Sequence, residues 1–218
     1  MKLLQSLLTH FFARHFRLIA LSALVAVVLI VFRLALAGNY QWSNVTPVAA
    51  IAVCFGLFVP RVMLATLLAL SGLLISDVVI NLVYVNRNPG EAFWSLMLSP
   101  AMLLRYAIFA GLVFAVSKLR DVKPSRLAFV WTPLGSLIFY ALSNTFAWAV
   151  SSGAFAYSKT FAGWWQSQTV GLPGFPPSYL FLRNALIGDL AFTSAFVLLV
   201  VCLPKSRHSL LNPAENPL

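Results

Sequence analysis

Charged side chains occur inside long apolar stretches of this sequence, where a charge usually has a function. Within these stretches stand Asp77, Arg105, Arg183 and Asp189, and Arg33 lies near the end of another. Three amides accompany them: Asn81, Asn144 and Asn184. Because a charge in an apolar environment needs a partner or a water-filled cavity, this set predicts buried ion pairs or a polar binding site.

The spacing of these residues leaves three interpretations open. Asp77 and Asn81 are four residues apart and would share one face of a helix. Arg105 is expected to pair with Asp77 or Asp189 across a helix bundle. The three charged residues then form buried ion pairs that fix helix packing, or build part of a ligand pocket, or relay protons or ions.

Several kinds of catalytic chemistry find no support in the residue types. The histidines His10, His15 and His208 stand near the two ends of the chain, so no Ser–His pair or zinc site can form with the charged set. No Walker A pattern is present. Cys54 and Cys202 lie in different apolar stretches without metal-ligand spacing. We therefore expect no enzyme, no cofactor and no metal.

The composition identifies the class of protein. Of 218 residues, 61% are hydrophobic and only 9% are charged, whereas soluble domains have about 25% charged residues. The chain is expected to be an all-α polytopic membrane protein. Its formal net charge of +10 is attributed to the cytoplasmic bias of Lys and Arg in membrane proteins and not to nucleic-acid binding.

Six apolar stretches predict six transmembrane helices. They cover residues 18–37, 45–59, 62–85, 94–117, 127–150 and 180–203. A basic N-terminus (1–17), a six-span domain (18–203) and a C-terminal tail (204–218) follow from this division. The second stretch is short for a full crossing, and it begins at Thr46-Pro47, which is typical of a helix start.

The basic residues predict the orientation. One side of the membrane would carry Lys2, Arg14, Arg17, Arg61, Lys118, Arg120, Lys123, Arg126, Lys205 and Arg207. The opposite loops hold only Arg87 and Lys159. The positive-inside rule then places both termini in the cytoplasm, which also agrees with an even number of spans.

The longest connection, residues 151–179, would lie outside. It is rich in aromatic residues, including Tyr157, Trp164 and Trp165. Such a loop is usually functional or disordered. Two interpretations remain: an interfacial aromatic belt, or a lid over an outward-facing site.

Most of the polar residues would lie in the outer halves of their helices. A pocket there would take its floor from Asp77, Asn81, Asn144, Arg183 and Asn184. Arg183 is the residue expected to bind a ligand carboxylate or phosphate, because its planar fork suits such groups. Tyr157, Trp164 and Trp165 would form apolar walls.

The first span carries a surface of small residues. Ser22 and Ala26 are four residues apart, with Ala23 beside them. Such surfaces allow close helix packing. Packing within the bundle and docking to a partner membrane subunit both remain open.

Several segments of the sequence together resemble an uncharacterised family of small bacterial membrane proteins. The matching segments are 44–50 (N-V-T-P-V-A-A), 75–77 (I-S-D), 143–144 (S-N), 157–163 (Y-S-K-T-F-A-G) and 182–189 (L-R-N-A-L-I-G-D). The stretch from Gln166 to Pro177 looks longer than the family pattern.

That family is in turn similar, in size and topology, to the substrate-binding S-components of energy-coupling-factor vitamin transporters. The resemblance implies a vitamin bound near the outer face of the bacterial inner membrane. A corrinoid such as cobalamin is the first guess for the ligand, with Cys54 as a candidate cobalt ligand. It also implies a possible energising membrane subunit.

Two functions of different classes follow. The first is a membrane protein that binds a vitamin or similar small solute for uptake. The second is a non-catalytic accessory or structural subunit of a larger membrane complex, in which the buried charges only specify packing.

Overall fold

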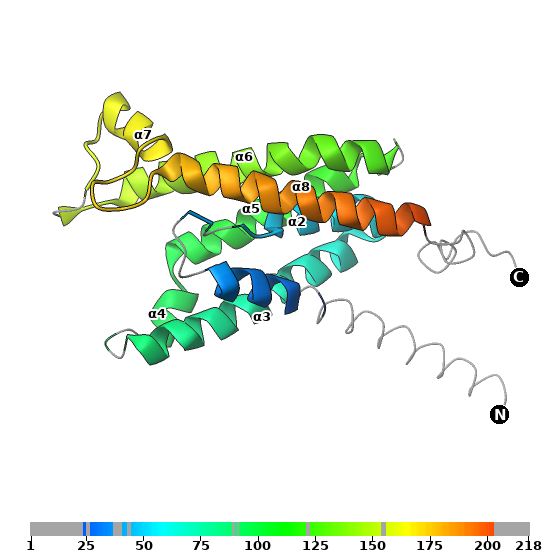
Figure 1. Ribbon diagram of the computed structural model, residues 1–218, viewed down its shortest axis with the longest axis horizontal. Coiled ribbons are helices and arrows are strands. Elements are labelled where there is room, and N and C mark those ends of the chain that lie inside the picture. The colour runs from blue at the N-terminus through cyan, green and yellow to red at the C-terminus, as the bar shows by residue number, and fades with distance from the viewer. Residues whose placement is uncertain are drawn as a thin grey trace, which may run out of the picture.

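The computed structural model describes residues 24, 27–36, 41–42, 45–88, 90, 92–120, 123–153 and 156–202, and its regular elements there are all helical (Figure 1). The labelled helices are α2 (Val48–Phe58), α3 (Val62–Arg87), α4 (Phe93–Met97), α5 (Pro100–Ser117), α6 (Pro124–Val150), α7 (Phe161–Gln168) and α8 (Ser178–Cys202). A further helical segment, Val27–Leu36, precedes them. The expected all-α class is therefore observed in the described part of the chain.

Four helical segments are long and apolar enough to cross a membrane. They are Val62–Arg87, Phe93–Ser117, Pro124–Val150 and Ser178–Val200, with 23 to 27 residues each. At 1.5 Å per residue, even the shortest spans more than about 30 Å, the thickness of the hydrocarbon core. These helices indicate a membrane protein.

Not all of the six predicted ranges form full-length membrane-spanning helices in the described part of the chain. The stretch predicted as 45–59 is the helix α2, which has 11 residues and is only about 16 Å long. Of the stretch 18–37, the described continuous helix is Val27–Leu36. The residues Ser22, Ala23 and Ala26, and the expected terminal regions 1–17 and 204–218, lie outside the described residues.

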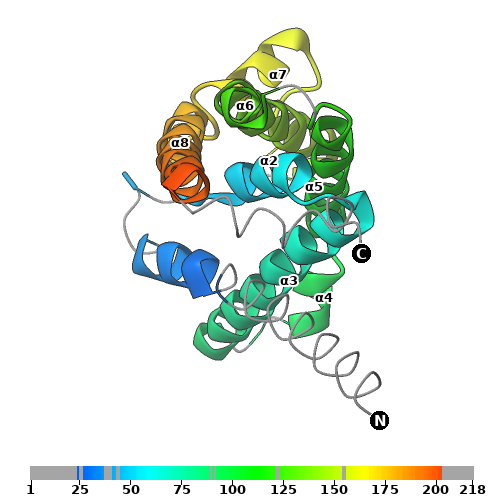
Figure 2. The same ribbon diagram turned by 90° about the vertical axis from the view of Figure 1, so that its right-hand side faces the viewer.

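The half-length helix α2 lies at the centre of the bundle. Viewed end-on, it is surrounded by α8, α6, α5 and α3 (Figure 2). Nine of its eleven residues are buried, as expected for a helix that is apolar on every side. Gly56 allows α5 to approach closely, because a Cβ there would lie 2.3 Å from Val116 Cγ2. Neighbouring helices therefore shield a helix too short to span alone.

The expected span 94–117 is divided near its start. Helix α4 ends at Met97 and α5 begins at Pro100. Proline is favoured in the first turn of a helix and disfavours helical geometry in the residue before it. Ser99 precedes α5, and its hydroxyl accepts a hydrogen bond from the Met102 amide at 3.3 Å.

The long connection 151–179 contains the short helix α7, which the sequence did not predict. Thr160 caps its N-terminus, accepting a hydrogen bond from the Gly163 amide at 3.2 Å. Lys159 Nζ donates to Ser151 O at 2.9 Å and Ala149 O at 3.2 Å, at the end of α6. These contacts fix the connection at one end of the bundle (Figure 1).

Candidate functional site

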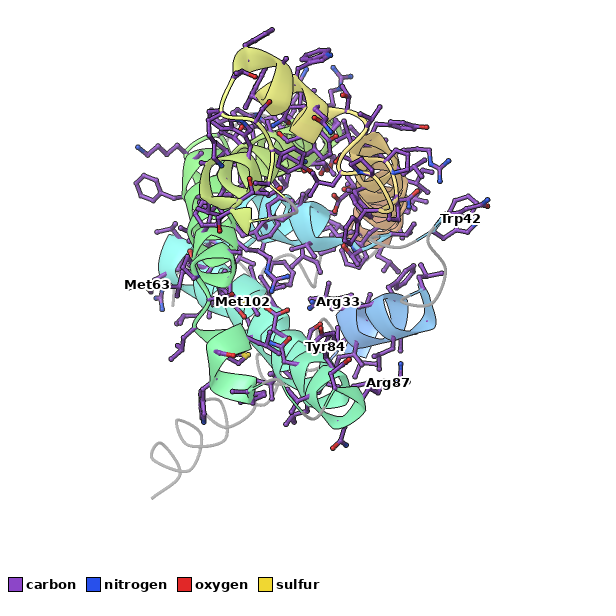
Figure 3. All side chains as sticks on the ribbon, turned by 90° about the vertical axis from the view of Figure 1, so that its left-hand side faces the viewer. Arg33, Trp42, Met63, Tyr84, Arg87 and Met102 are labelled. Carbon is purple, nitrogen blue, oxygen red and sulfur yellow. The ribbon has the colours of Figure 1, made fainter. Side chains whose placement is uncertain are left out.

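The Asp77 carboxylate in α3 is enclosed by donors from two other elements, α5 and the segment Val27–Leu36. Its Oδ2 accepts hydrogen bonds from Arg105 Nη2 at 2.9 Å and from the Tyr106 hydroxyl at 2.8 Å. Its Oδ1 contacts Arg33 Nη1, which also donates to Ser76 Oγ at 2.9 Å. Asp77 is 0% exposed. Figure 3 shows Arg33 directed from its own helix into the space between the helices.

This cluster holds more positive than negative charge. Two guanidinium groups, Arg33 and Arg105, form salt bridges to the single carboxylate of Asp77. The Nε of Arg105 is buried and has no hydrogen-bond partner among the described residues. The cluster is therefore a buried site with one surplus cation.

The Asp189 carboxylate in α8 has a different environment. It is 2% exposed, and it accepts hydrogen bonds from the Ala50 amide at 2.8 Å and from Ser136 Oγ at 2.7 Å. Ala50 lies in the first turn of α2, where amides have no partner within the helix and the helix dipole favours an anion. Asp189 therefore caps the N-terminus of the central half-length helix.

The expected pairing of Arg105 is thus with Asp77 and not with Asp189. Within the described part of the chain, Asp189 forms no salt bridge. The physical reason is that the N-terminus of α2 lies inside the bundle and presents its unpaired amides to this carboxylate. Neutral donors therefore take the place of a cation.

The residues just before Asp189 hold the segment that precedes α2. The side chain of Asn184 is 0% exposed and donates to Gln41 O at 2.9 Å. Arg183 is exposed; its guanidinium also donates to Gln41 O and lies 5.4 Å from the ring centroid of Trp42. These contacts tie the start of α8 to the residues that lead into the central helix.

Gly188 completes this contact between α8 and the chain before α2. A Cβ at Gly188 would lie 2.9 Å from the backbone nitrogen of Thr46, so a side chain would force the two segments apart. The segment 182–189, singled out in the sequence for its R-N-x-L-x-G-D pattern, thus positions the N-terminus of α2.

A cavity of about 270 Å³ lies between the Asp77 cluster and Asp189. Its polar lining includes Arg33, Arg105, Ser136, Ser143, Asn144 and Asp189. Its apolar lining includes Phe109, Phe139 and Phe181. The first turn of α2 contributes Val48 and Ala49. Charged, hydroxyl, amide and aromatic groups from the segment of Arg33 and from α5, α6 and α8 therefore face one space.

Only part of the predicted site lines this cavity. Of the predicted residues, Arg105, Asn144 and Asp189 do. Asp77 lies behind the two arginines, and Asn81 donates instead to Met97 Sδ at 3.1 Å. Arg183 and Asn184, expected in the floor, are absent from the lining because they bind the segment before α2. The ligand-binding role expected for Arg183 is therefore not supported by its position.

The aromatic residues of 151–179 also lie away from the cavity. Trp164 Nε1 donates to Thr145 Oγ1 of α6 at 2.9 Å, and Trp165 is 56% exposed. Tyr157 hydrogen-bonds with Ser178, and burial raises the pKa of its phenol above the ordinary value. None of the described residues of 151–179 (151–153 and 156–179) lines the cavity, so Tyr157, Trp164 and Trp165 do not form its wall.

Sequence reasoning missed the contribution of α6 apart from Asn144. Ser136, Ser143 and Asn144 all line the cavity. Their spacing of seven and eight residues places them on one helix face, a signal that the sequence contained. Arg33 was counted in the charged set, but it was assigned neither to the ion pairs nor to the site.

A second cavity of about 280 Å³ lies beside the first, between the start of α5 and α6. Ser99, Met102 and Leu104 contribute to its lining. Arg105, Phe139 and Ser143 line both cavities. Arg105 therefore stands between two adjoining spaces.

The proposed cobalt ligand Cys54 is not placed to act as one. Its side chain is fully buried in α2 and lines neither cavity. Among the described residues, no group of three or more His, Cys, Asp or Glu side chains could hold a metal ion.

Comparison with family models matches residues 12–211 to one family, described as a family of unknown function (DUF6580). The chain belongs to the DUF6580 family. The match extends over the helices and both cavities described above. Neither the curated proteins nor the solved structures gave a match for this DUF6580 chain.

Proposed function

We propose that this DUF6580 protein is a non-enzymatic membrane protein that binds a small solute for uptake. The observation that carries the proposal is the cavity of about 270 Å³ between the Asp77 cluster and Asp189. Solute sites typically combine largely apolar walls with a few well-placed polar groups. This cavity has that character, with three phenylalanines beside arginine, serine and asparagine side chains.

The interrupted architecture around the cavity supports this proposal. Transporters often build their sites from discontinuous helices whose ends lie within the membrane. Here the first turn of the half-length helix α2 lines the cavity, and it is held there by Asp189. A helix that ends at a cavity has no evident role in a subunit whose buried charges only fix packing.

The proposal includes an orientation. With both termini in the cytoplasm of the bacterial inner membrane, the segment 151–179 lies outside. The cavity residues of α6 and α8, including Asn144 and Phe181, stand near the ends of these helices that adjoin this segment. A solute would then enter from outside, as in S-components, and an energising subunit would dock on the first helix at Ser22, Ala23 and Ala26.

The cavity volume bears on the choice of solute. A space of about 270 Å³ is near the lower end of the roughly 300–1,000 Å³ of ligand pockets. A corrinoid macrocycle with its side groups is much larger than this. A small vitamin or a similar one-ring solute fits the volume better.

The direct test is a cavity-filling variant with a matched control on the same helix. Ala185 lines the cavity, whereas Ala191, also in α8, is exposed. Native mass spectrometry of protein purified from its own membrane should detect a bound solute in the wild type and in Ala191→Phe. Ala185→Phe should lose it. A solute retained equally by both variants would place the site elsewhere.

One observation favours the accessory-subunit alternative. Arg33 and Arg105 both pair with Asp77 inside the bundle, as charges that only fix packing would. If that alternative holds, the wild-type protein carries no small molecule, and affinity purification recovers a stoichiometric membrane partner in its place.

A further inference from the structure

We infer that the cavity takes a small organic anion, whose carboxylate or other oxyanion binds the guanidinium of Arg105. This inference rests on the proposed function and names the chemical class of its solute. It assigns the anion-binding role to Arg105 and not to Arg183, the residue that the sequence favoured.

The first argument is the charge of the cavity wall. Arg33 and Arg105 both line the cavity, while Asp77, their shared partner, does not. Two cations thus face the space and one anion lies behind them. The two guanidiniums share one carboxylate, so an incoming anion would offset the surplus positive charge on this side of the cavity. The other charged group in the lining, Asp189, faces the cavity from α8.

The second argument is the hydrogen bonding of Arg105. Its bonds to described residues, Asp77 and Met102, all come from Nη2. The Nε is buried without a partner, and Nη1 donates to no described residue. The buried Nε is out of reach of a solute, so the donors that remain for an oxyanion are the N–H groups of Nη1. Arg105 therefore keeps donors for an oxyanion.

The second carboxylate of the cavity does not oppose this assignment. The oxygens of Asp189 accept hydrogen bonds from Ala50 N and Ser136 Oγ, and the N-terminal dipole of α2 offsets part of its charge. The repulsion between Asp189 and a bound anion is thereby reduced, and the cation pair dominates the opposite wall.

The apolar lining and the volume narrow the class further. Phe109, Phe139 and Phe181 line the cavity, and aromatic walls suit a flat apolar body. An apolar cavity of about 150 Å³ already accommodates benzene. A cavity of about 270 Å³ therefore fits a one-ring acid, with Ser136, Ser143 and Asn144 available for its polar substituents.

The test compares three probes of nearly equal shape: benzoate, benzamide and benzylamine. Each is titrated into purified full-length protein in lipid nanodiscs, with the melting temperature and the calorimetric Kd as readouts. Benzoate should raise the melting temperature and bind at least tenfold more tightly than benzamide, and benzylamine should bind least. This comparison uses the wild-type chain and does not depend on a variant that folds.

Variants then show which arginine binds the carboxylate of benzoate. Arg105→Lys keeps the positive charge but loses the fork, and should weaken benzoate binding about tenfold without changing benzamide binding. Arg183→Lys, on an exposed side chain outside the cavity, should change neither. Ala185→Phe should abolish binding of every probe.

The outcomes separate this inference from the proposed function. Equal binding of benzoate and benzamide, lost in Ala185→Phe, would overturn the anion assignment and leave solute binding intact. Benzoate binding weakened by Arg183→Lys and not by Arg105→Lys would also overturn it. Binding that Ala185→Phe does not reduce would contradict the proposed cavity itself.

Discussion

Two buried carboxylates, Asp77 and Asp189, stand on opposite sides of one cavity and are stabilised in different ways. Asp77 is held by two guanidinium groups and a tyrosine hydroxyl. Asp189 is held by one serine hydroxyl and an amide of a helix end. The first gathers charge from three helical segments; the second fixes the position of a helix. The difference suggests that the Asp77 side meets a charged solute, while the Asp189 side builds the space around it.

The largest expected effect concerns the loss of charge at each carboxylate. Asp77→Asn leaves two partly buried guanidiniums without a counter-ion and should lower the free energy of unfolding by about 3–5 kcal/mol. Asp189→Asn keeps an acceptor for the Ala50 amide and should lower it by about 1–2 kcal/mol. Unfolding of both variants in lipid bicelles measures the two values. Equal losses would remove the distinction between the two sites.

The Asp189 side should depend on close backbone packing. Gly188→Ala places a Cβ 2.9 Å from Thr46 N and should lower the free energy of unfolding by about 2 kcal/mol, as overpacking does. The control is Gly111→Ala in α5, where a Cβ meets nothing within 4 Å and alanine favours the helix. If Gly188→Ala is tolerated as well as Gly111→Ala, the tight contact between α8 and the segment before α2 does not exist.

The smallest expected effect is the coupling free energy between Arg105 and each carboxylate, which double-mutant cycles measure. The two cycles compare Asp77 with Asp189 directly. The losses for Arg105→Gln and Asp77→Asn should be less than additive by about 1 kcal/mol, because the residues are in contact. The coupling stays modest since Arg33 and Tyr106 continue to hold Asp77. Arg105→Gln and Asp189→Asn should add within about 0.5 kcal/mol. Strong coupling in the second cycle would show that Arg105 serves both acids.

Much of this arrangement could be predicted from residue types. A charge in an apolar stretch requires a partner, so Arg105 was expected to pair with Asp77 or Asp189, and the structure has the salt bridge to Asp77. The helical class follows from composition alone. The partner of Asp189 could not be predicted in this way, because it is a backbone amide in the first turn of α2. The helix start at Thr46-Pro47 was recognised, but residue types do not reveal that this end lies inside the bundle beside α8.

The position of the cavity was only partly predictable. Asn144 was expected in the site, and its helical spacing to Ser136 and Ser143 could have extended the prediction along α6. Arg183 was chosen as the ligand-binding residue because its planar fork suits a carboxylate or phosphate. In the structure its guanidinium donates to a backbone carbonyl, Gln41 O. The fold of 151–179 onto α6 depends on contacts such as Trp164 to Thr145, which residue spacing cannot show.

The central claim is that a solute from outside reaches the cavity between Asp77 and Asp189. Single cysteines at position 185, in the lining, and at position 191, on the exposed face of α8, test it most directly in a chain where Cys54 and Cys202 are replaced by serine. A small membrane-impermeant thiol reagent added from outside should modify Ala185→Cys, and benzoate should slow this reaction at least fivefold. Ala191→Cys should react slowly, because the exposed face of a membrane-spanning helix meets lipid and not water, and benzoate should have no effect on this reaction. An unreactive Ala185→Cys, or a reaction that benzoate does not change, would contradict the account.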